Sequence, residues 1–213
     1  MYRRFGAFQC NLLLEGFYTR LNHVFVLEEI GKDEEHNAVI KERRNGQGAE
    51  VAGVTVEGKV AYLSLVQLQA GVTWQKSHYT RPEKWSKDSS VPAEKRIFRT
   101  PDWYGYFTAT YSPVKPLNIA LSGTYTGSMI VQHMKGYIPK DIAVTTPDFF
   151  DMNLKISYDF SLYKFITLQL NAGVQNIFNA YQRGFDQGKE RDSGYIYGPS
   201  MPRSYFAGAK LMF

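Results

Sequence analysis

The side chains that usually carry chemistry are scattered along this 213-residue chain, and none has the spacing of a catalytic or metal site. Nucleophile–base catalysis needs a serine, a histidine and a carboxylate in one set, and no such set can be assembled here. Cys10 is the only cysteine, so it can neither form an internal disulfide nor bind a metal by itself. The histidines have no metal-ligand spacing; they are His23, His36, His78 and His133. We therefore expect no enzyme, no cofactor and no metal site.

Two further groups of residues have both a functional and a structural interpretation. Asp186, Glu190 and Asp192 lie close together, but their spacing differs from that of a calcium-binding loop, which favours a solvated loop. Trp85 and Trp103 are candidates for stacking on a substrate ring, although anchoring at a membrane interface is the favoured reading. The substrate-binding residues are therefore unknown at this stage.

Composition narrows the class of protein. The net charge is +5, but the charged runs 32–44 and 81–96 mix both signs, which indicates solvated loops and excludes a nucleic-acid partner. Hydrophobic residues make up 44% of the chain and aromatic residues 15%, a composition that suits strands and membrane interfaces. No apolar run reaches the length of about 18 residues that a membrane-spanning helix requires. The mean hydropathy of -0.34 remains compatible with membrane strands, which turn only half of their side chains to lipid.

Strict alternation of apolar and polar residues predicts about eight antiparallel strands in an all-β fold. In the clearest strand, Phe150, Met152, Leu154, Ile156 and Tyr158 alternate with polar or charged residues. In the first strand, Leu13 and Phe17 are exceptions on the polar face. The expected strands cover about 8–26, 48–60, 65–79, 102–111, 117–129, 150–159, 166–175 and 204–213.

The connections between these strands alternate in length. Long segments follow the first, third, fifth and seventh strands, namely 27–47 (possibly with a hairpin of its own), 80–100, 130–148 and 179–202. Short connections follow the others, at 61–64, 112–116 and 160–164, and the two prolines of 112–116 are expected to end the strand ladder. Short turns at one end and long loops at the other are typical of a transmembrane β-barrel of the outer membrane with up-and-down hairpins.

The last 43 or so residues resemble the end of a TonB-dependent outer-membrane receptor. The segment 171–181 is similar to the penultimate strand of that family, and 197–208 to the segment that enters its last strand. The family-motif residues are Asn176, Phe178, Asn179, Tyr181, Gly198, Pro202 and Arg203. The segment 44–57 resembles an earlier strand of the family, and the Tyr and Phe content resembles receptors of the Bacteroides group.

The resemblance implies that residues 1–213 are the C-terminal portion of a receptor barrel, the last third of 22 strands, with the plug domain and earlier strands absent. It implies energised uptake of a bulky nutrient, of the iron–siderophore, haem or cobalamin class, in the outer membrane of a Gram-negative bacterium. The implied partners are outer-membrane lipid and lipopolysaccharide, the barrel-assembly machinery, the plug domain and the TonB energy-coupling protein. The tail resembles the outer-membrane assembly signal at Gly208, Leu211 and Phe213, where Phe206 replaces a usually polar residue.

Two alternatives remain open from the sequence. One is a self-contained eight-stranded outer-membrane barrel with a structural or adhesive role. The other is a soluble, lipocalin-like binding barrel, because alternation alone does not say which face meets water. The sequence does not name the substrate, the oligomeric state or whether the chain folds alone.

Overall fold

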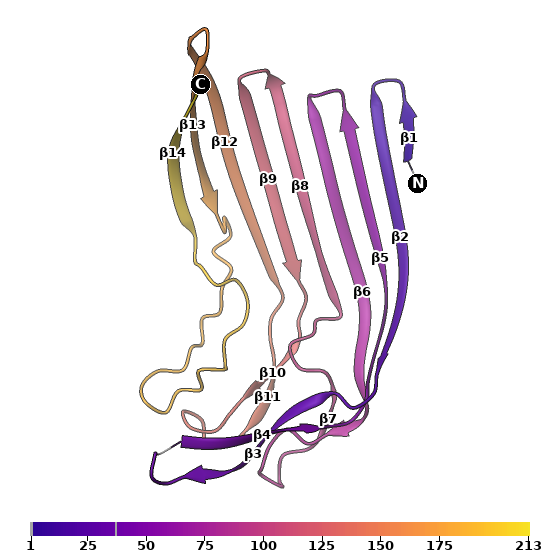
Figure 1. Ribbon diagram of the computed structural model, residues 1–213, viewed down its shortest axis with the longest axis vertical. Helices are drawn as coiled ribbons and strands as arrows, with labels where there is room; N and C mark the ends of the chain where they lie inside the picture. The colour runs from indigo at the N-terminus through magenta and orange to yellow at the C-terminus, as the bar shows by residue number, and fades with distance from the viewer. Residues whose placement is uncertain (1, 37) are drawn as a thin grey trace.

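One curved antiparallel sheet dominates the computed structural model, which describes residues 2–36 and 38–213 (Figure 1). All eight expected strands are present. They are β2 (Phe8–Leu21), β5 (Ala49–Tyr62), β6 (Val66–Glu83), β8 (Trp103–Val114), β9 (Leu117–Thr126), β12 (Phe149–Tyr163), β13 (Ile166–Gln175) and β14 (Ser204–Met212). A short strand that the sequence analysis missed, β1 (Tyr2–Phe5), pairs with the start of β2 through a tight turn at Gly6, whose φ is 59°.

Neighbours in sequence are neighbours in the sheet, in the order β1-β2-β5-β6-β8-β9-β12-β13-β14. This is the up-and-down hairpin topology that the sequence predicts. The sheet is open: β1 and β14 lie at opposite ends of the order and on opposite sides of the view in Figure 1. The described residues therefore do not form the closed barrel that both alternative interpretations require.

The connections differ at the two ends of the sheet, as expected. Figure 1 shows the short turns together at the top and the long connections together at the bottom. The long connections carry structure of their own: the hairpin β3 (Phe25–Asp33) with β4 (Ala38–Asn45), the short β7 (Glu94–Arg96), and the hairpin β10 (Ile130–His133) with β11 (Ile142–Thr145). The hairpin suspected within 27–47 is thus present, although Asn37 lies outside the described residues.

Two predicted boundaries are wrong for identifiable reasons. The first long strand ends at Leu21 rather than near residue 26, because the chain turns at His23 with a φ of 60°. The prolines of 112–116 do not end the ladder as expected: β8 continues through Pro113 to Val114, with a register shift between Tyr111 and Val114. Such an irregularity accommodates a proline, which cannot donate a ladder hydrogen bond.

The buried apolar side chains of the described residues gather towards the long-loop end of the molecule. Among the described residues, the buried apolar side chains are Ala49, Ile130, Val131, Phe149 and Tyr195. Ile130 and Val131 belong to the β10–β11 hairpin, and Tyr195 belongs to the connection between β13 and β14. In the described chain, no helix is long and apolar enough to cross a membrane.

Candidate functional site on the polar face and the long loops

The apolar face of the sheet is continuous and uncovered. Strand register places the apolar series of neighbouring strands opposite one another, as in the row Gly105, Tyr125 and Phe150. Many of these side chains are exposed, including Leu14 at 70% and Tyr205 at 74%. No charged residue interrupts the face between its aromatic ends in any of the eight long strands. Such a face is stable only against a non-aqueous medium or a partner.

Aromatic rings border the apolar face at both ends. Phe8 and Tyr62 pack at 4.6 Å near the short turns, and Trp74 and Trp103 lie 6.3 Å apart near the long loops. Ten residues separate Phe8 from Tyr18 on β2, which corresponds to a band about 25 Å tall for a strand tilted by about 40°. This is the height of the hydrocarbon band of an outer-membrane barrel. Trp103 therefore lies where an interfacial anchor belongs, while the Trp85 ring packs on Phe98 inside the loops.

The opposite, polar face carries cross-strand hydrogen bonds. The Gln69 amide donates to the Glu57 carboxylate over 2.9 Å and to the Tyr106 hydroxyl over 3.1 Å. The hydroxyls of Thr55 and Thr73 are 2.9 Å apart. Nearer the short turns, a glutamine on β13 donates in the same way to Asp159 on β12. These pairs satisfy polar groups without closing the face, so it remains available to a wet interior or to a partner.

Aromatic rings on the polar face cover glycines of the neighbouring strand. A Cβ on Gly53 would stand 2.5 Å from the Phe17 ring, and one on Gly173 would stand 2.5 Å from the Phe206 ring. Phe17 and Phe206 are directly opposite those glycines in the register. The two aromatic residues that break the sequence pattern are therefore packing partners of glycines, which explains why they face the polar side.

A cavity of about 580 Å³ lies on the polar face beneath the loop that joins β7 to β8. Hydroxyl, amide and aromatic side chains form most of its lining: Thr55, Thr73, Gln75, Tyr104, Tyr106, Thr124 and Thr126. Arg99 also lines it, but its guanidinium donates to the carbonyl oxygens of Ile196, at 2.8 Å, and Gly194. Arg99 thus joins two loops at the mouth of the cavity.

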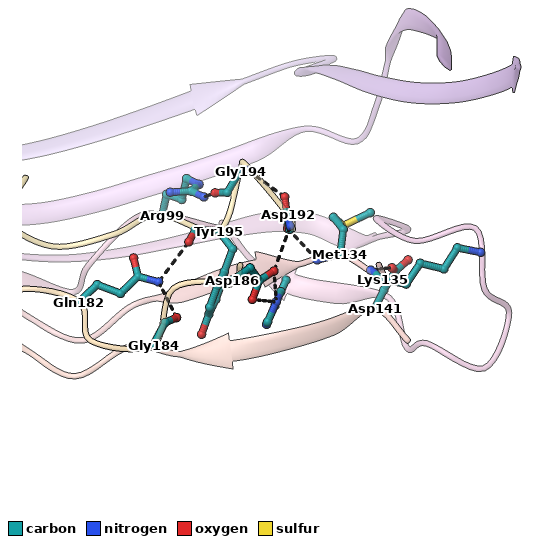
Figure 2. A network of polar contacts seen from close by, with 11 residues as sticks. Arg99, Met134, Lys135, Asp141, Gln182, Gly184, Asp186, Asp192, Gly194 and Tyr195 are labelled. Atoms are coloured by element: carbon teal, nitrogen blue, oxygen red, sulfur yellow. Dashed lines mark hydrogen bonds and ion pairs between the residues drawn. The ribbon is translucent and has the colours of Figure 1, made fainter. Parts of the chain in front are cut away.

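A polar network holds the long loops together (Figure 2). The buried Gln182 amide donates to the carbonyls of Gly184 and Tyr195, both at 3.1 Å, and accepts from the Tyr197 N–H at 2.9 Å. His133 contacts both carboxylate oxygens of Asp186, at 3.0 and 2.9 Å. We call the packed segments 84–102, 127–148 and 176–203 the loop unit.

Burial and charge within the loop unit alter two pKa values. Burial raises the pKa of Tyr195 to about 12, with contributions from the neighbouring Tyr197 hydroxyl and the charge of Asp186. Its ring also stacks on His133 at 3.7 Å. Burial opposes ionisation of Asp186 as well, but hydrogen bonds from the Asp192 N–H and from His133 hold the pKa of its carboxyl below the ordinary value. Asp186 therefore functions as an internal acceptor.

The acidic group considered for calcium is used inside the loop unit. Asp192 accepts the N–H of Met134 at 2.8 Å and that of Gly194 at 2.8 Å. Within residues 2–36 and 38–213, no group of three or more His, Cys, Asp and Glu is arranged to hold a metal ion. The sequence analysis did not find the His133–Asp186 pair, because its members are 53 residues apart and no local pattern links them.

The family-motif residues meet at the start of the last long connection. Asn176 is 3% exposed and has a φ of 50°; its amide donates to the carbonyls of Ala180, at 3.0 Å, and Met201, at 2.9 Å. Asn179 accepts the Arg203 N–H at 2.9 Å. Gly198 adopts a φ of 77° against the Phe149 ring. Asn176 and Asn179 thus join the start of this connection to its end at Met201 and Arg203, and we call this arrangement the loop clamp. Pro202 lines a cavity together with Asn176, whereas Gly198 packs on Phe149. Phe178 lies outside the clamp with its ring 5.8 Å from that of Phe150, and Tyr181 is half-buried.

The three residues that resemble an assembly signal lie elsewhere, along β14 and the residue after it. Gly208 stands opposite Asn171 on the polar face, and Leu211 stands opposite Leu168 on the apolar face, where it is 51% exposed. Phe213 is 92% exposed. The fold therefore places Leu211 and Phe213 on the uncovered apolar surface at the short-turn end and separates them from the loop clamp.

An antiparallel up-and-down sheet with one lipid-compatible face, one polar face and all long loops at one end defines a transmembrane β-barrel wall. The chain belongs to the TonB-dependent receptor family, because the family model described as "TonB dependent receptor-like, beta-barrel" matches residues 4–177. Asn176 lies inside this match, whereas the other motif residues and the assembly signal lie beyond it. A search of curated proteins finds no match.

Several solved structures with a similar fold are receptors for ferric siderophores. The ferric enterobactin receptor PfeA of Pseudomonas aeruginosa is similar with a TM-score of 0.58 and 15% identity over 99% of this chain. The ferric-catecholate import receptor Fiu of E. coli is similar with a TM-score of 0.56 and 20% identity over 96% of this chain. The ferripyoverdine receptor of the P. aeruginosa outer membrane is similar with a TM-score of 0.58 and 15% identity over 97% of this chain. The chain spans only 29%, 27% and 25% of these three receptors, respectively.

Proposed function

We propose that residues 1–213 form the C-terminal portion of the barrel of a TonB-dependent receptor in the outer membrane of a Gram-negative bacterium. The single observation that carries this proposal is the open sheet whose uncharged apolar face is uncovered along its whole length. Lipid would cover that face, and lipopolysaccharide would surround the long-loop end. The missing strands, placed between β14 and β1, would close the barrel.

The proposed activity is energised uptake of a bulky nutrient. In this reading, the polar face lines the barrel interior and meets a plug domain, and the TonB protein supplies energy to that plug. The loop unit would then lie on the outer side, and the 580 Å³ cavity would open towards it, where a ligand would first arrive. In this proposal the substrate passes through the barrel chemically unchanged.

Among bulky nutrients, we propose a ferric siderophore ahead of haem or cobalamin. The support is that the similar structures are receptors for ferric enterobactin, ferric catecholates and ferripyoverdine. At these identities the likeness concerns the fold, so the substrate class needs a direct measurement. The aromatic and hydroxyl lining of the cavity is compatible with a large ligand that presents rings and oxygens.

The test is uptake of radioactive iron by cells that carry or lack the receptor containing this chain. We expect uptake of at least one ferric siderophore to require both the receptor and the proton-motive force. Uptake of labelled haem and cobalamin, measured in the same strains, distinguishes the other two substrate classes. Equal uptake of ferric siderophore, haem and cobalamin by cells with and without the receptor would contradict the proposal.

We also propose that Gly208, Leu211 and Phe213 are read by the barrel-assembly machinery. The support is geometric: Leu211 and Phe213 stand exposed at the end of an edge strand, where another protein can reach them without unfolding the sheet. The adhesive or purely structural eight-stranded barrel has no comparable support, because the described strands do not close.

A further inference from the structure

One short piece of the last long connection, the segment 194–197, is fixed by a buried side chain. Gln182 is 1% exposed; its amide donates to the Tyr195 carbonyl at 3.1 Å, and its oxygen accepts the Tyr197 N–H at 2.9 Å. The buried Tyr195 ring adds a second support, because it stacks on His133. Buried peptide groups need their hydrogen-bond partners, so loss of the Gln182 amide would loosen this segment.

Arg99 holds the same segment from another loop (Figure 2). Its guanidinium donates to the carbonyl of Ile196 at 2.8 Å and to that of Gly194. These two carbonyls flank the one that accepts from Gln182, so the two side chains bind successive peptide groups. A shift of the segment 194–197 therefore changes the acceptors that are available to Arg99.

The backbone of Arg99 belongs to the wall of the 580 Å³ cavity. Residues 99–101, which we call the roof segment, all line the cavity, whereas none of the described lining residues belongs to 194–197. Arg99 has a φ of 60°, which non-glycine residues seldom adopt, and its N–H donates to the Ile130 carbonyl at 2.8 Å. A backbone in such a conformation persists only where its surroundings hold it.

We propose that Arg99 is a positioning residue that makes the shape of this cavity depend on the segment 194–197. While Gln182 holds 194–197, the carbonyls of that segment fix the guanidinium, and the guanidinium fixes the roof segment. When 194–197 is loosened, the roof segment loses this support although nothing inside the cavity has changed. The role of the cavity in capturing a nutrient rests on the proposed function, whereas the coupling of the two segments does not.

A second route between the two segments runs through the β10–β11 hairpin. Tyr195 stacks on His133 of that hairpin, and Ile130 of the same hairpin accepts the Arg99 N–H. This route uses the backbone of Arg99 and not its guanidinium. Removal of the side chain therefore separates the two routes.

The experiment is a double-mutant cycle read by hydrogen exchange and mass spectrometry on the intact receptor that contains this chain. Gln182→Met removes the amide and keeps most of the volume. We expect it to speed exchange about tenfold in both 194–197 and the roof segment. In an Arg99→Ala background, Gln182→Met should speed exchange in 194–197 only, and in an Arg99→Lys background it should recover part of its effect on the roof segment.

Arg96→Ala provides the matched control background. Arg96 is an exposed arginine of the same connection, but it pairs with Glu94 at 3.1 Å. In this background Gln182→Met should act on both segments as in the wild type. The proposal is overturned if Gln182→Met speeds exchange of the roof segment equally with and without the Arg99 side chain, or if it leaves the roof segment unchanged in both.

A receptor with Gln182→Met that does not fold leaves a milder variant. Asp192 is half-buried and accepts the Gly194 N–H at 2.8 Å, so Asp192→Ala loosens the segment 194–197 at its start. The same comparison with and without the Arg99 side chain then decides the proposal by the same outcomes.

Uptake kinetics test the positioning role itself, with the ferric siderophore that the radioactive-iron measurement identifies. We expect Arg99→Ala to raise the half-saturation concentration about tenfold and to leave the maximal rate nearly unchanged, because the cavity is misshapen while transport proceeds as before. Arg99→Lys should recover part of the affinity, and Arg96→Ala should behave as the wild type. An unchanged half-saturation concentration in Arg99→Ala contradicts the positioning role. If no siderophore is transported, the proposed function fails, and the exchange experiment still decides the coupling.

Discussion

At the scale of single residues, Tyr195 joins the loops by ring stacking and by burial of its hydroxyl. Because its pKa is raised from 10.0 to about 12, the folded loop unit favours the neutral phenol. A raised pKa contributes stability that is complete below the unfolded value of about 10 and is lost as the pH rises towards about 12. We expect the loop unit to open in that range, measured by hydrogen exchange of 176–203 alongside phenolate absorbance. Tyr195→Phe should remove this alkaline transition, and an unchanged transition would contradict the assignment.

Gly173 matters at the same scale because a Cβ there would stand 2.3 Å from the Leu154 carbonyl oxygen and 2.5 Å from the Phe206 ring. We expect Gly173→Val to destabilise the receptor by about 1–3 kcal/mol, since the new methyl groups must displace the ring or the strand. Denaturant unfolding in detergent measures this. Gly58→Val is the control, because a Cβ there meets nothing within 4 Å. Equal effects of the two variants would show that strand glycines act through the backbone alone.

At the scale of elements, β12 places adjacent residues on opposite faces of the sheet, and we expect one face to meet lipid and the other the barrel interior. Ile156 lies on the apolar face and is 43% exposed, whereas Ser157 lies on the polar face. We expect Ile156→Arg to cost about 2–4 kcal/mol in a bilayer, because a charge would stand in the middle of the hydrocarbon band. Ser157→Arg should cost much less. Reversible unfolding from lipid vesicles measures the free-energy cost of both substitutions. A larger cost for Ser157→Arg than for Ile156→Arg would mean that the polar face, and not the apolar face, meets lipid.

The end of the chain is the second element with a clear expectation. Phe213 and Tyr163 are both exposed aromatic residues at the short-turn end, at 92% and 71%. If Phe213 belongs to an assembly signal, Phe213→Ala should reduce the amount of folded receptor in the outer membrane, whereas Tyr163→Ala should not. The measurement is the heat-modifiable fraction in isolated outer membranes. Equal losses would mean that any aromatic of the girdle serves the same purpose.

At the scale of the whole molecule, the described chain has two unsatisfied surfaces: the apolar face and the two ends of the open sheet, at β1 and β14. Both favour association of copies in water. We expect residues 1–213, produced alone, to aggregate in water and to show no heat-modifiable mobility after refolding in detergent. Light scattering and gel mobility measure these outcomes. A soluble monomer would support the lipocalin-like barrel, and a closed barrel in detergent would support the self-contained eight-stranded barrel.

Sequence alone was enough for the eight long strands, their faces and the two ends of the sheet, but not for the short strands β1, β7, β10 and β11. A period of two is local, so alternating residues such as those from Phe150 to Tyr158 reveal the strand before any contact is known. Loop lengths can also be read directly from the sequence, and their alternation shows which end of each strand lies on the long-loop side. The resemblance of the last segments pointed to the family that the match over residues 4–177 establishes.

The tertiary structure alone decided what depends on register and on distant partners. Pattern reading left Phe17 and Phe206 as exceptions, because only the pairing of β2 with β5 and of β13 with β14 places a glycine opposite each ring. His133 and Asp186 meet only through loop packing, because 53 residues separate them in the sequence. Alternation can be read from consecutive residues, whereas these contacts depend on which distant segments of the chain pack together.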